Sequence, residues 1–146
     1  MEGDHLHFTL EIAGQTLTCR IVPMGEDVSI CLFGGQRPHI GCTVLAIPRP
    51  SLTGSGCSAT VSMLNRTGHK DDIVAAHVAK AVASRRNCAV SCSCGIHIDN
   101  ASPRLLKAIA AAPDAIAQRI CVLLDSQNAN APHAEAKSAL RQEPSH

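Results

Sequence analysis

The strongest constraint on the fold is an alternation of apolar and polar residues along the first 64 residues. Every second residue of 5–12 is apolar, which is the period of a strand with one buried face. Turn-forming residues at 13–15 and 23–27 separate this run from similar runs at 16–22 and 28–32. We therefore expect a hairpin over the first two runs and a third strand directly after it.

Two further runs are typical of strands. Residues 40–47 are almost continuously apolar and are bounded by Pro48 and Pro50. Such a run predicts a strand that is central in the sheet or buried on both faces. Residues 57–64 alternate again and predict a fifth strand.

Helical spacing begins only after these five strands. The remaining elements are expected as a helix over 73–84, a strand over 89–98 and a helix over 102–126. Asp71 or Asp72 can cap the first helix, and Ser102 with Pro103 is a typical start of the second. Pro113 lies inside the second helical pattern, so we expect a kink or a restart there.

The order β-β-β-β-β-α-β-α predicts an α+β domain with a six-stranded, mainly antiparallel sheet. Consecutive strands with short turns indicate antiparallel pairing. We place one domain at 1–127 and a mostly disordered tail at 128–146, where no apolar period is sustained. Two helices cannot cover both faces of such a sheet, so we expect a homo-oligomer that buries the open face.

Composition excludes several classes of function. Thirteen basic and 12 acidic residues give a net charge of +1, which lacks the basic footprint of a nucleic-acid binder. The chain has two aromatic residues, Phe8 and Phe33, too few for binding single strands by base stacking. No apolar stretch could span a membrane and the N-terminus lacks the features of a signal peptide, so we expect a cytoplasmic protein. Its eight cysteines, including Cys31 and Cys121 inside apolar runs, are then expected to be buried thiols.

Three polar clusters follow strand ends, at 34–41, 65–72 and 95–103, and each contains a histidine. Loops on a rigid scaffold are the usual place for binding chemistry. In the second cluster, Gly68 permits close approach of a ligand, and the helix that starts near Lys70 offers free N–H groups to an anion such as phosphate.

Basic side chains strengthen this interpretation. Arg66 and Lys70 add positive charge, and Arg37 of the first cluster could add a forked donor. The alternative is structural: Asp71 and Asp72 would cap the helix, and the cations would be solvated.

A metal site is a second possibility. His39, His69 and His97, with Asp71 or Asp99, offer the nitrogen and oxygen ligands that zinc, manganese or iron use. Their spacing matches no compact ligand motif, and the chain contains no Walker loop, Gly-x-Gly-x-x-Gly motif or nucleophile elbow.

The three clusters together resemble the prenylated-flavin chaperone family, the LpdD-like proteins. The matching segments are Arg37-Pro38-His39-Ile40-Gly41, Gly68-His69-Lys70-Asp71-Asp72 and Gly95-Ile96-His97-Ile98-Asp99-Asn100-Ala101, within residues 5–126. The resemblance implies a fold like that of proteasome assembly chaperones and an oligomeric state. It also implies a non-catalytic role: binding prenylated FMN, or FMN, and delivering it to a UbiD-class decarboxylase of gallate or another hydroxybenzoate, or maturing that enzyme.

The resemblance also implies roles for individual residues. Gly68, His69, Lys70 and Asp71 would line the phosphate end of the flavin; Arg37, His39 and Gly41 would flank it; and His97, Asp99 and Asn100 would bind ring heteroatoms or a metal. With so few aromatic residues, the flavin ring would lie on aliphatic side chains and peptide planes.

A shared binding site of this kind requires the three turns, which are distant in the sequence, to converge on one hollow. Two alternatives stay open: a small metal-dependent enzyme with a His/Asp site, and an assembly chaperone that binds no cofactor.

Overall fold

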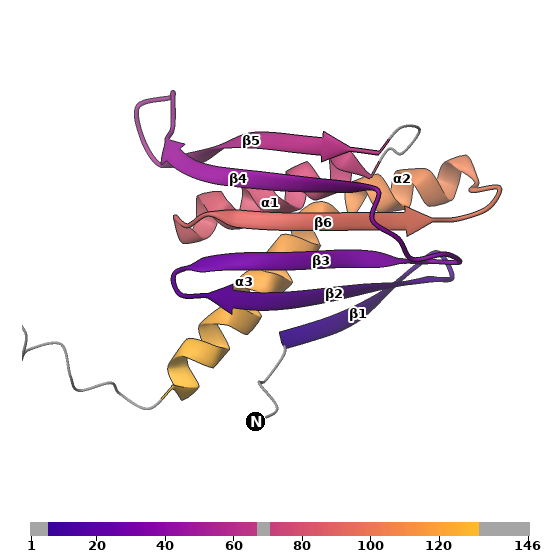
Figure 1. Ribbon diagram of the computed structural model, residues 1–146, viewed down its shortest axis with the longest axis horizontal. Coiled ribbons are helices and arrows are strands. Elements are labelled where there is room, and N and C mark those ends of the chain that lie inside the picture. The colour runs from indigo at the N-terminus through magenta and orange to yellow at the C-terminus, as the bar shows by residue number, and fades with distance from the viewer. Residues whose placement is uncertain (1–5, 67–70, 132–146) are drawn as a thin grey trace, which may run out of the picture.

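The alternating runs form one sheet, with helices behind it (Figure 1). The computed structural model describes residues 6–66 and 71–131. Its strands are β1 (Leu6–Ile12), β2 (Gln15–Met24), β3 (Asp27–Gly35), β4 (Cys42–Pro50), β5 (Cys57–Asn65) and β6 (Val90–His97). Its helices are α1 (Asp72–Arg86), α2 (Pro103–Ala111) and α3 (Pro113–Asn130).

The two N-terminal hairpins have the turns that their residues favour. Ala13 and Gly14 link β1 to β2 with φ angles of 47° and 82°, and positive φ at both central residues is the type I′ arrangement. Gly25, with a φ of 67°, opens the turn between β2 and β3. These turns match the right-handed twist of the strands that they connect.

The strand order of the sheet is β1-β2-β3-β6-β4-β5. The α+β class and the mainly antiparallel sheet are confirmed, because among the described strands only the β3–β6 pairing is parallel. The expectation that all five N-terminal strands pair in sequence is wrong at one place. The last strand, β6, lies between β3 and β4, so these two never pair.

The environment of β4 also differs from the expectation. It is an interior strand, but one of its faces is open, with Thr43, Leu45 and Ile47 exposed. It continues through Pro48 to Pro50, because its pairing with β6 ends at Ala46 and proline tolerates a position without a partner strand on one side.

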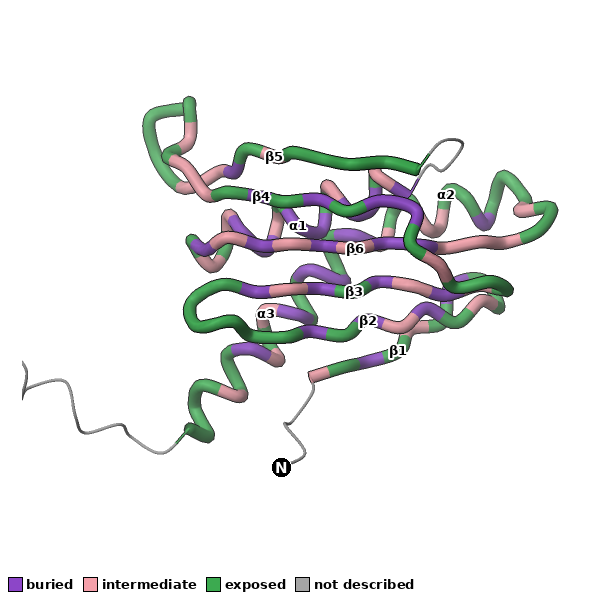
Figure 2. Tube along the Cα trace, viewed as in Figure 1, coloured by how far each residue is buried: buried purple, intermediate pink, exposed green. Residues whose placement is uncertain are grey.

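The core lies between the sheet and the helices. Alternate strand residues point towards α1 and α3 and are buried, which gives the striped pattern of Figure 2. Ile116 and Ile120 of α3 join this core, and the guanidinium of Arg119 lies 4.4 Å from the centre of the Phe8 ring. A smaller cluster of Ile12, Leu17 and Leu105 anchors α2.

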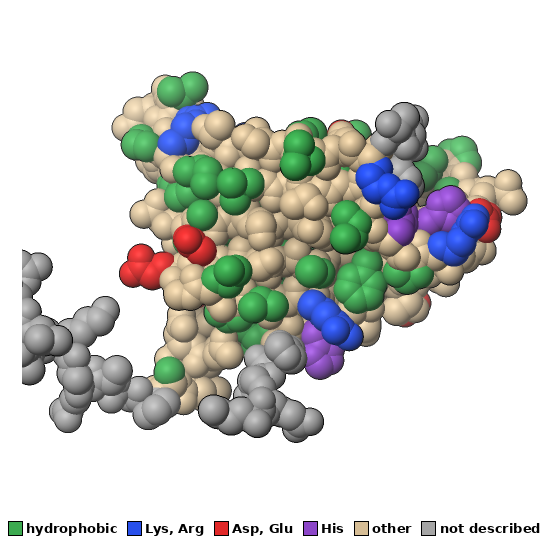
Figure 3. All heavy atoms as spheres, viewed as in Figure 1, with side chains coloured by type: hydrophobic (Ala, Val, Ile, Leu, Met, Phe, Trp, Pro, Cys, Tyr) green, Lys and Arg blue, Asp and Glu red, His purple; other side chains and the backbone are tan. Residues whose placement is uncertain are grey.

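The opposite face of the sheet carries no helix within the described residues (Figure 1). It presents hydroxyl groups, such as the pair Thr43–Ser93 at 3.0 Å, together with exposed aliphatic side chains such as Leu45 and Ile47. Hydrophobic side chains are scattered across this face in Figure 3.

All eight cysteines are free thiols. Five are buried: Cys19, Cys42, Cys88, Cys92 and Cys94. Burial raises the pKa of Cys19 to about 12 and that of Cys42 to about 11, so these thiols stay neutral and pack as small hydrophobic residues. The expected burial of Cys31 is wrong, because its side chain points to the open face, and Cys121 is only partly buried.

The second helical pattern restarts at Pro113, as expected, and gives two helices instead of one. Ser102 caps α2 by accepting a hydrogen bond from the Leu105 amide at 3.1 Å. Helix α3 runs to Asn130, three residues past the domain boundary that we expected at 127. Residues 132–146 of the predicted tail lie outside the described residues. None of the helices within the described ranges has the length and hydropathy that crossing a membrane requires.

Candidate functional site

The described residues of the three polar clusters meet at one end of the sheet. Strands β3 and β6 are parallel, so both end there, and β5 also ends there because it is antiparallel to β4. Since β6 separates β3 from β4, the loop between those strands must cross the end of β6. It passes so close that a Cβ at Gly95 would collide with the carbonyl of His39.

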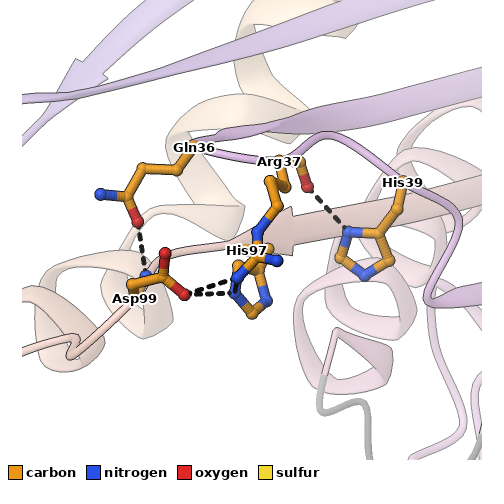
Figure 4. A network of polar contacts seen from close by, with 5 residues as sticks. All are labelled: Gln36, Arg37, His39, His97 and Asp99. Carbon is orange, nitrogen blue, oxygen red and sulfur yellow. Dashed lines mark hydrogen bonds and ion pairs between the residues drawn. The ribbon is translucent and has the colours of Figure 1, made fainter.

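Arg37, His97 and Asp99 form one polar network at this end (Figure 4). Arg37 Nη2 donates to Asp99 Oδ1 at 2.7 Å and lies 2.9 Å from His97 Nε2. His97 Nε2 lies 2.8 Å from Asp99 Oδ1. The hydrogen bonds from His97 and Arg37 lower the pKa of the Asp99 carboxyl below its usual value.

His97 Nε2 faces two partners of opposite character. The carboxylate of Asp99 only accepts hydrogen bonds, and the guanidinium of Arg37 only donates them. A protonated Nε2 can therefore donate to Asp99, whereas an unprotonated Nε2 can accept from Arg37. The network can form with either tautomer of the His97 ring.

Gln36 ties the two loops of the network together. Its side-chain oxygen accepts a hydrogen bond from the Asp99 backbone amide at 2.6 Å, and its backbone amide donates to the His97 carbonyl at 2.8 Å. Gln36 was not among the predicted site residues. Its only signal was its position between two glycines and an arginine at a strand end.

His39 is held from behind by a buried carboxylate. Its Nδ1 lies 3.0 Å from the Arg37 carbonyl, and its Nε2 lies 3.5 Å from Asp71 Oδ2. Asp71, 9% exposed, also accepts a hydrogen bond from the Ile96 amide at 3.1 Å. Asp71 occupies the N-cap of α1, but its side chain makes no capping hydrogen bond there. It links the start of α1 to the end of β6 and to His39.

Gly41 makes room for this pair. A Cβ at Gly41 would meet the Asp71 carboxylate and approach His39 Nε2. Its amide donates to the Cys94 carbonyl and its carbonyl accepts from the Arg66 amide, both at 2.8 Å. Gly41 thus links the end of β6 to the residue that follows β5.

A hollow of about 230 Å3 opens in front of these residues, lined by Arg37, His39, Arg66 and His97. Arg66 is fixed by a hydrogen bond from Nη1 to the Ile40 carbonyl at 3.1 Å. Two guanidinium groups and two imidazoles around one small hollow form a donor set that suits a phosphate. Figure 3 shows basic and histidine side chains gathered at this end of the molecule.

A second hollow of about 360 Å3 adjoins the first on the open face and shares His39 with it. Its walls include Phe33, Pro38 and Ile40. Phe33, one of the two aromatic residues of the chain, was not among the predicted site residues. No motif or spacing in the sequence indicates that Phe33 lies beside the site residues of the loop that follows it.

The predicted site residues thus have different positions. Arg37, His39 and His97 line the first hollow, Asp99 contacts two of them, and Asp71 supports His39 from the interior. Arg66, which sequence reasoning named only for its charge, is a fourth wall residue. Asn100 adopts a left-handed φ of 52° in the turn after β6 and does not line either hollow. Gly68, His69 and Lys70 lie outside the described residues.

Comparison with known proteins identifies the family of this chain. Residues 11–125 match the family described as the prenylated flavin chaperone LpdD-like domain. This chain belongs to that family. It is also similar to Protein LpdD of Lactiplantibacillus plantarum, with 31% identity over 117 residues that cover 77% of this chain and 80% of that protein. Membership of the LpdD-like chaperones supports a non-catalytic accessory role.

The fold of this LpdD-like protein is also that of a proteasome assembly chaperone. A chain from the crystal structure of a chaperone complex for yeast 20S proteasome assembly aligns with a TM-score of 0.52 at 18% identity. The alignment covers 85% of this chain and 96% of the yeast chain. The expected fold family is confirmed.

The described part of this LpdD-like protein contains no cluster of side chains that supports the metal hypothesis. Within residues 6–66 and 71–131, no group of three or more His, Cys, Asp or Glu side chains is arranged to hold a metal ion. The rings of His39 and His97 stand edge to face with centres 6.2 Å apart. His69, the third candidate histidine, lies outside the described residues.

We predict that Asp71→Ala lowers the free energy of unfolding by about 1–3 kcal/mol, because the partly buried Ile96 amide loses its acceptor. Asp71→Asn keeps an acceptor oxygen, so its free energy of unfolding should fall by less. Urea unfolding at neutral pH measures both. Asp114→Ala is the control, because it breaks only an exposed pair with His77 and should cost at most about 1 kcal/mol. Equal losses for Asp71→Ala and Asp114→Ala would contradict the supporting role of Asp71.

We also predict an acidic pH dependence of the Arg37–His97–Asp99 network. Because the folded-state pKa of Asp99 is lowered, the contacts stabilise the fold above the ordinary carboxyl pKa and are lost as the pH falls through the lowered value. An NMR titration of the Asp99 side chain should give a pKa that rises in His97→Ala and in Arg37→Ala. An unchanged pKa in both variants would show that the network does not persist in solution.

Proposed function

We propose that this protein binds prenylated FMN, or FMN, and delivers it to a UbiD-class decarboxylase of aromatic acids, or matures that enzyme. The observation that supports the proposal most strongly is the adjacency of the two hollows. A cationic hollow and an apolar hollow share His39, and a flavin nucleotide likewise joins a phosphate to a largely apolar ring system.

The phosphate end of the flavin would lie against Arg37 and Arg66. Arg37 uses one terminal nitrogen for the network, and Arg66 uses one for the Ile40 carbonyl, so each has N–H groups left for a phosphate oxygen. Lys70 stays a candidate for the same end, as the family resemblance implies.

The ring end would lie in the hollow beside Phe33, Pro38 and Ile40. Its volume of about 360 Å3 falls within the range of small-molecule sites, about 300–1,000 Å3. The Phe33 ring offers an aromatic surface, with the Arg20 guanidinium 6.0 Å from its centre. When bound, the flavin would supply its own redox and electrophilic chemistry to the partner enzyme, while this chain would bind and orient it.

The partner and the compartment are part of the same proposal. A carrier for this cofactor would meet its UbiD-class decarboxylase in the cytoplasm. An assembly chaperone that binds no cofactor is the second candidate, favoured by the fold that the chain shares with a proteasome assembly chaperone. The flavin experiment below separates the two, because only the carrier needs the cationic hollow.

The open face of the sheet supports a further part of the proposal, a homo-oligomer. Leu45 and Ile47 are about half exposed there, and the nearby hydroxyl groups of Thr43 and Ser93 can pair across an interface. Exposed apolar area of this kind on a sheet face is typical of an interaction surface. We propose that two copies bury these faces against each other.

We predict that Arg66→Ala weakens FMN binding by about 1.5–3 kcal/mol, the range for hydrogen bonds to charged groups. Riboflavin lacks the phosphate, so its affinity should be unchanged in this variant. Isothermal titration with both ligands measures the difference. Arg49→Ala is the matched control, because Arg49 hydrogen-bonds to Thr60 and to the Pro50 carbonyl away from the hollows.

Two results would count against the carrier. One is the absence of measurable FMN and prenylated FMN binding by the intact protein. The other is an equal loss of FMN and riboflavin affinity in Arg66→Ala, which would indicate a structural defect and not a lost phosphate contact.

We predict that Leu45→Glu shifts the protein towards its 15.3 kDa monomer, because the substitution places a charge in the proposed interface. Analytical ultracentrifugation over a concentration series measures this shift. Leu52→Glu is the control, since Leu52 is 90% exposed in the loop between β4 and β5. A wild-type chain that is monomeric at high concentration would refute the homo-oligomer.

A further inference from the structure

Strand β5 forms an edge of the sheet that lacks the usual protection. It pairs with β4 on one side and with no described strand on the other (Figure 1). Its nine residues include no charged side chain and no proline. The opposite edge, β1, carries His7 and Glu11, and its Thr9 carbonyl accepts a hydrogen bond from Arg119 at 3.3 Å. Exposed uncharged edges invite the addition of another strand.

The backbone groups of β5 that face this edge can be identified. Hydrogen bonding to one neighbour alternates along an antiparallel strand, and the Arg66 amide, just after β5, donates towards β4. Leu64 and Ser62 lie two and four residues before Arg66, so their amides also face β4. Those of Met63 and Val61 therefore face the open edge.

A groove runs beside this edge, between β5 and α1, with a volume of about 600 Å3. Side chains from both elements line it: Val61, Met63, Ala76, His77, Lys80, Ala81 and Ser84. Val61 and Met63 thus turn their side chains into the groove and their backbone groups to the edge. A strand added to β5 would place every second side chain over the groove.

The charge of the groove is positive. Lys80 makes no ion pair within the described residues, and no carboxylate lines the groove in that part of the chain. His77 hydrogen-bonds to Asp114 of α3 at 3.0 Å, which places that carboxylate beyond the groove wall. A segment with an acidic side chain among apolar ones would complement this surface.

We propose that β5 and this groove bind an extended segment of a partner protein, which adds to the sheet as a seventh strand. The segment places apolar side chains against Val61 and Met63 and an acidic side chain against Lys80. Main-chain hydrogen bonds at the edge would give affinity, and the groove would give specificity. This surface is separate from both hollows, so the proposed strand addition does not depend on flavin binding.

A second copy of this chain is a poorer occupant. Two β5 strands could pair at their edges, but β5 has no acidic residue to place against Lys80. A two-fold arrangement would also bring a second uncompensated Lys80 to the same interface. The charges therefore favour a different polypeptide.

The test uses a synthetic peptide, Thr-Val-Thr-Glu-Thr-Val-Thr, blocked at both ends, and the intact protein. NMR should show shifts of the β5 amides, and a fluorescent copy should give a saturable polarisation curve. Replacing the glutamate of the peptide by lysine should weaken binding by about fivefold, the effect of one exposed ion pair. Lys80→Glu should reverse this preference, whereas Lys107→Glu, the same charge change on α2, should not.

The backbone part of the proposal has its own test. Val61→Pro removes an amide that faces the open edge, so the protein should fold but lose the peptide. Methylation of alternate peptide nitrogens should abolish binding in one register only, and this result needs no altered protein. The proposal is overturned if the glutamate peptide does not bind, if Lys80→Glu leaves the preference unchanged, or if ultracentrifugation shows a dimer that Val61→Pro dissociates and Leu45→Glu does not.

Discussion

The parallel pairing of β3 with β6 is the constraint on which the rest of the site depends. It inserts the last strand between β3 and β4 and forces their connecting loop across the end of β6. Both polar segments that contain the Arg37–His97–Asp99 network are brought together by this crossing. With β3 and β4 paired directly, the loop would be a simple hairpin turn and Arg37 would have no reason to reach His97.

The crossing is possible because β6 has no side chain where the loop passes. At Gly95 the backbone of His39 occupies the space of a Cβ. Asp71 then fastens the layers together, because one carboxylate contacts both the Ile96 amide of β6 and the His39 imidazole of the loop. A buried carboxylate is stable only when such partners replace the water that it has lost. The interior therefore fixes His39, while Arg37 stays 68% exposed on a flexible stem.

The sequence was most informative where local periodicity decides structure. The alternating runs, the two tight turns and the restart at Pro113 all follow from local residue preferences. The strand order did not follow, because pairing of β6 with β3 depends on the contacts of residues about 60 positions apart. Short turns favour sequential pairing, and nothing in residues 36–41 alone indicates that this turn spans another strand.

The residues of the candidate site also divide into those that the sequence indicates and those that only the fold places there. Residues of distinctive chemistry, such as Arg37, His39 and His97, could be selected from sequence because they stand beside glycines at strand ends. Gln36 and Phe33 could not, since a glutamine in a loop and a phenylalanine in a strand are ordinary until the fold places them. Asp71 was selected for a different role, because the position before a helix is also typical of a capping residue.

The balance between a rigid and an exposed half of the site has a consequence for the proposed carrier. A carrier must hold its cargo and also release it to the next protein. His39, fixed by Asp71, would orient the ligand, whereas the exposed Arg37 and Asp99 act through solvent-screened charges. Screened contacts weaken with salt and with competing anions, and they can be exchanged for those of a partner without unfolding the carrier. A deeply buried ion pair would bind more rigidly and would oppose that transfer.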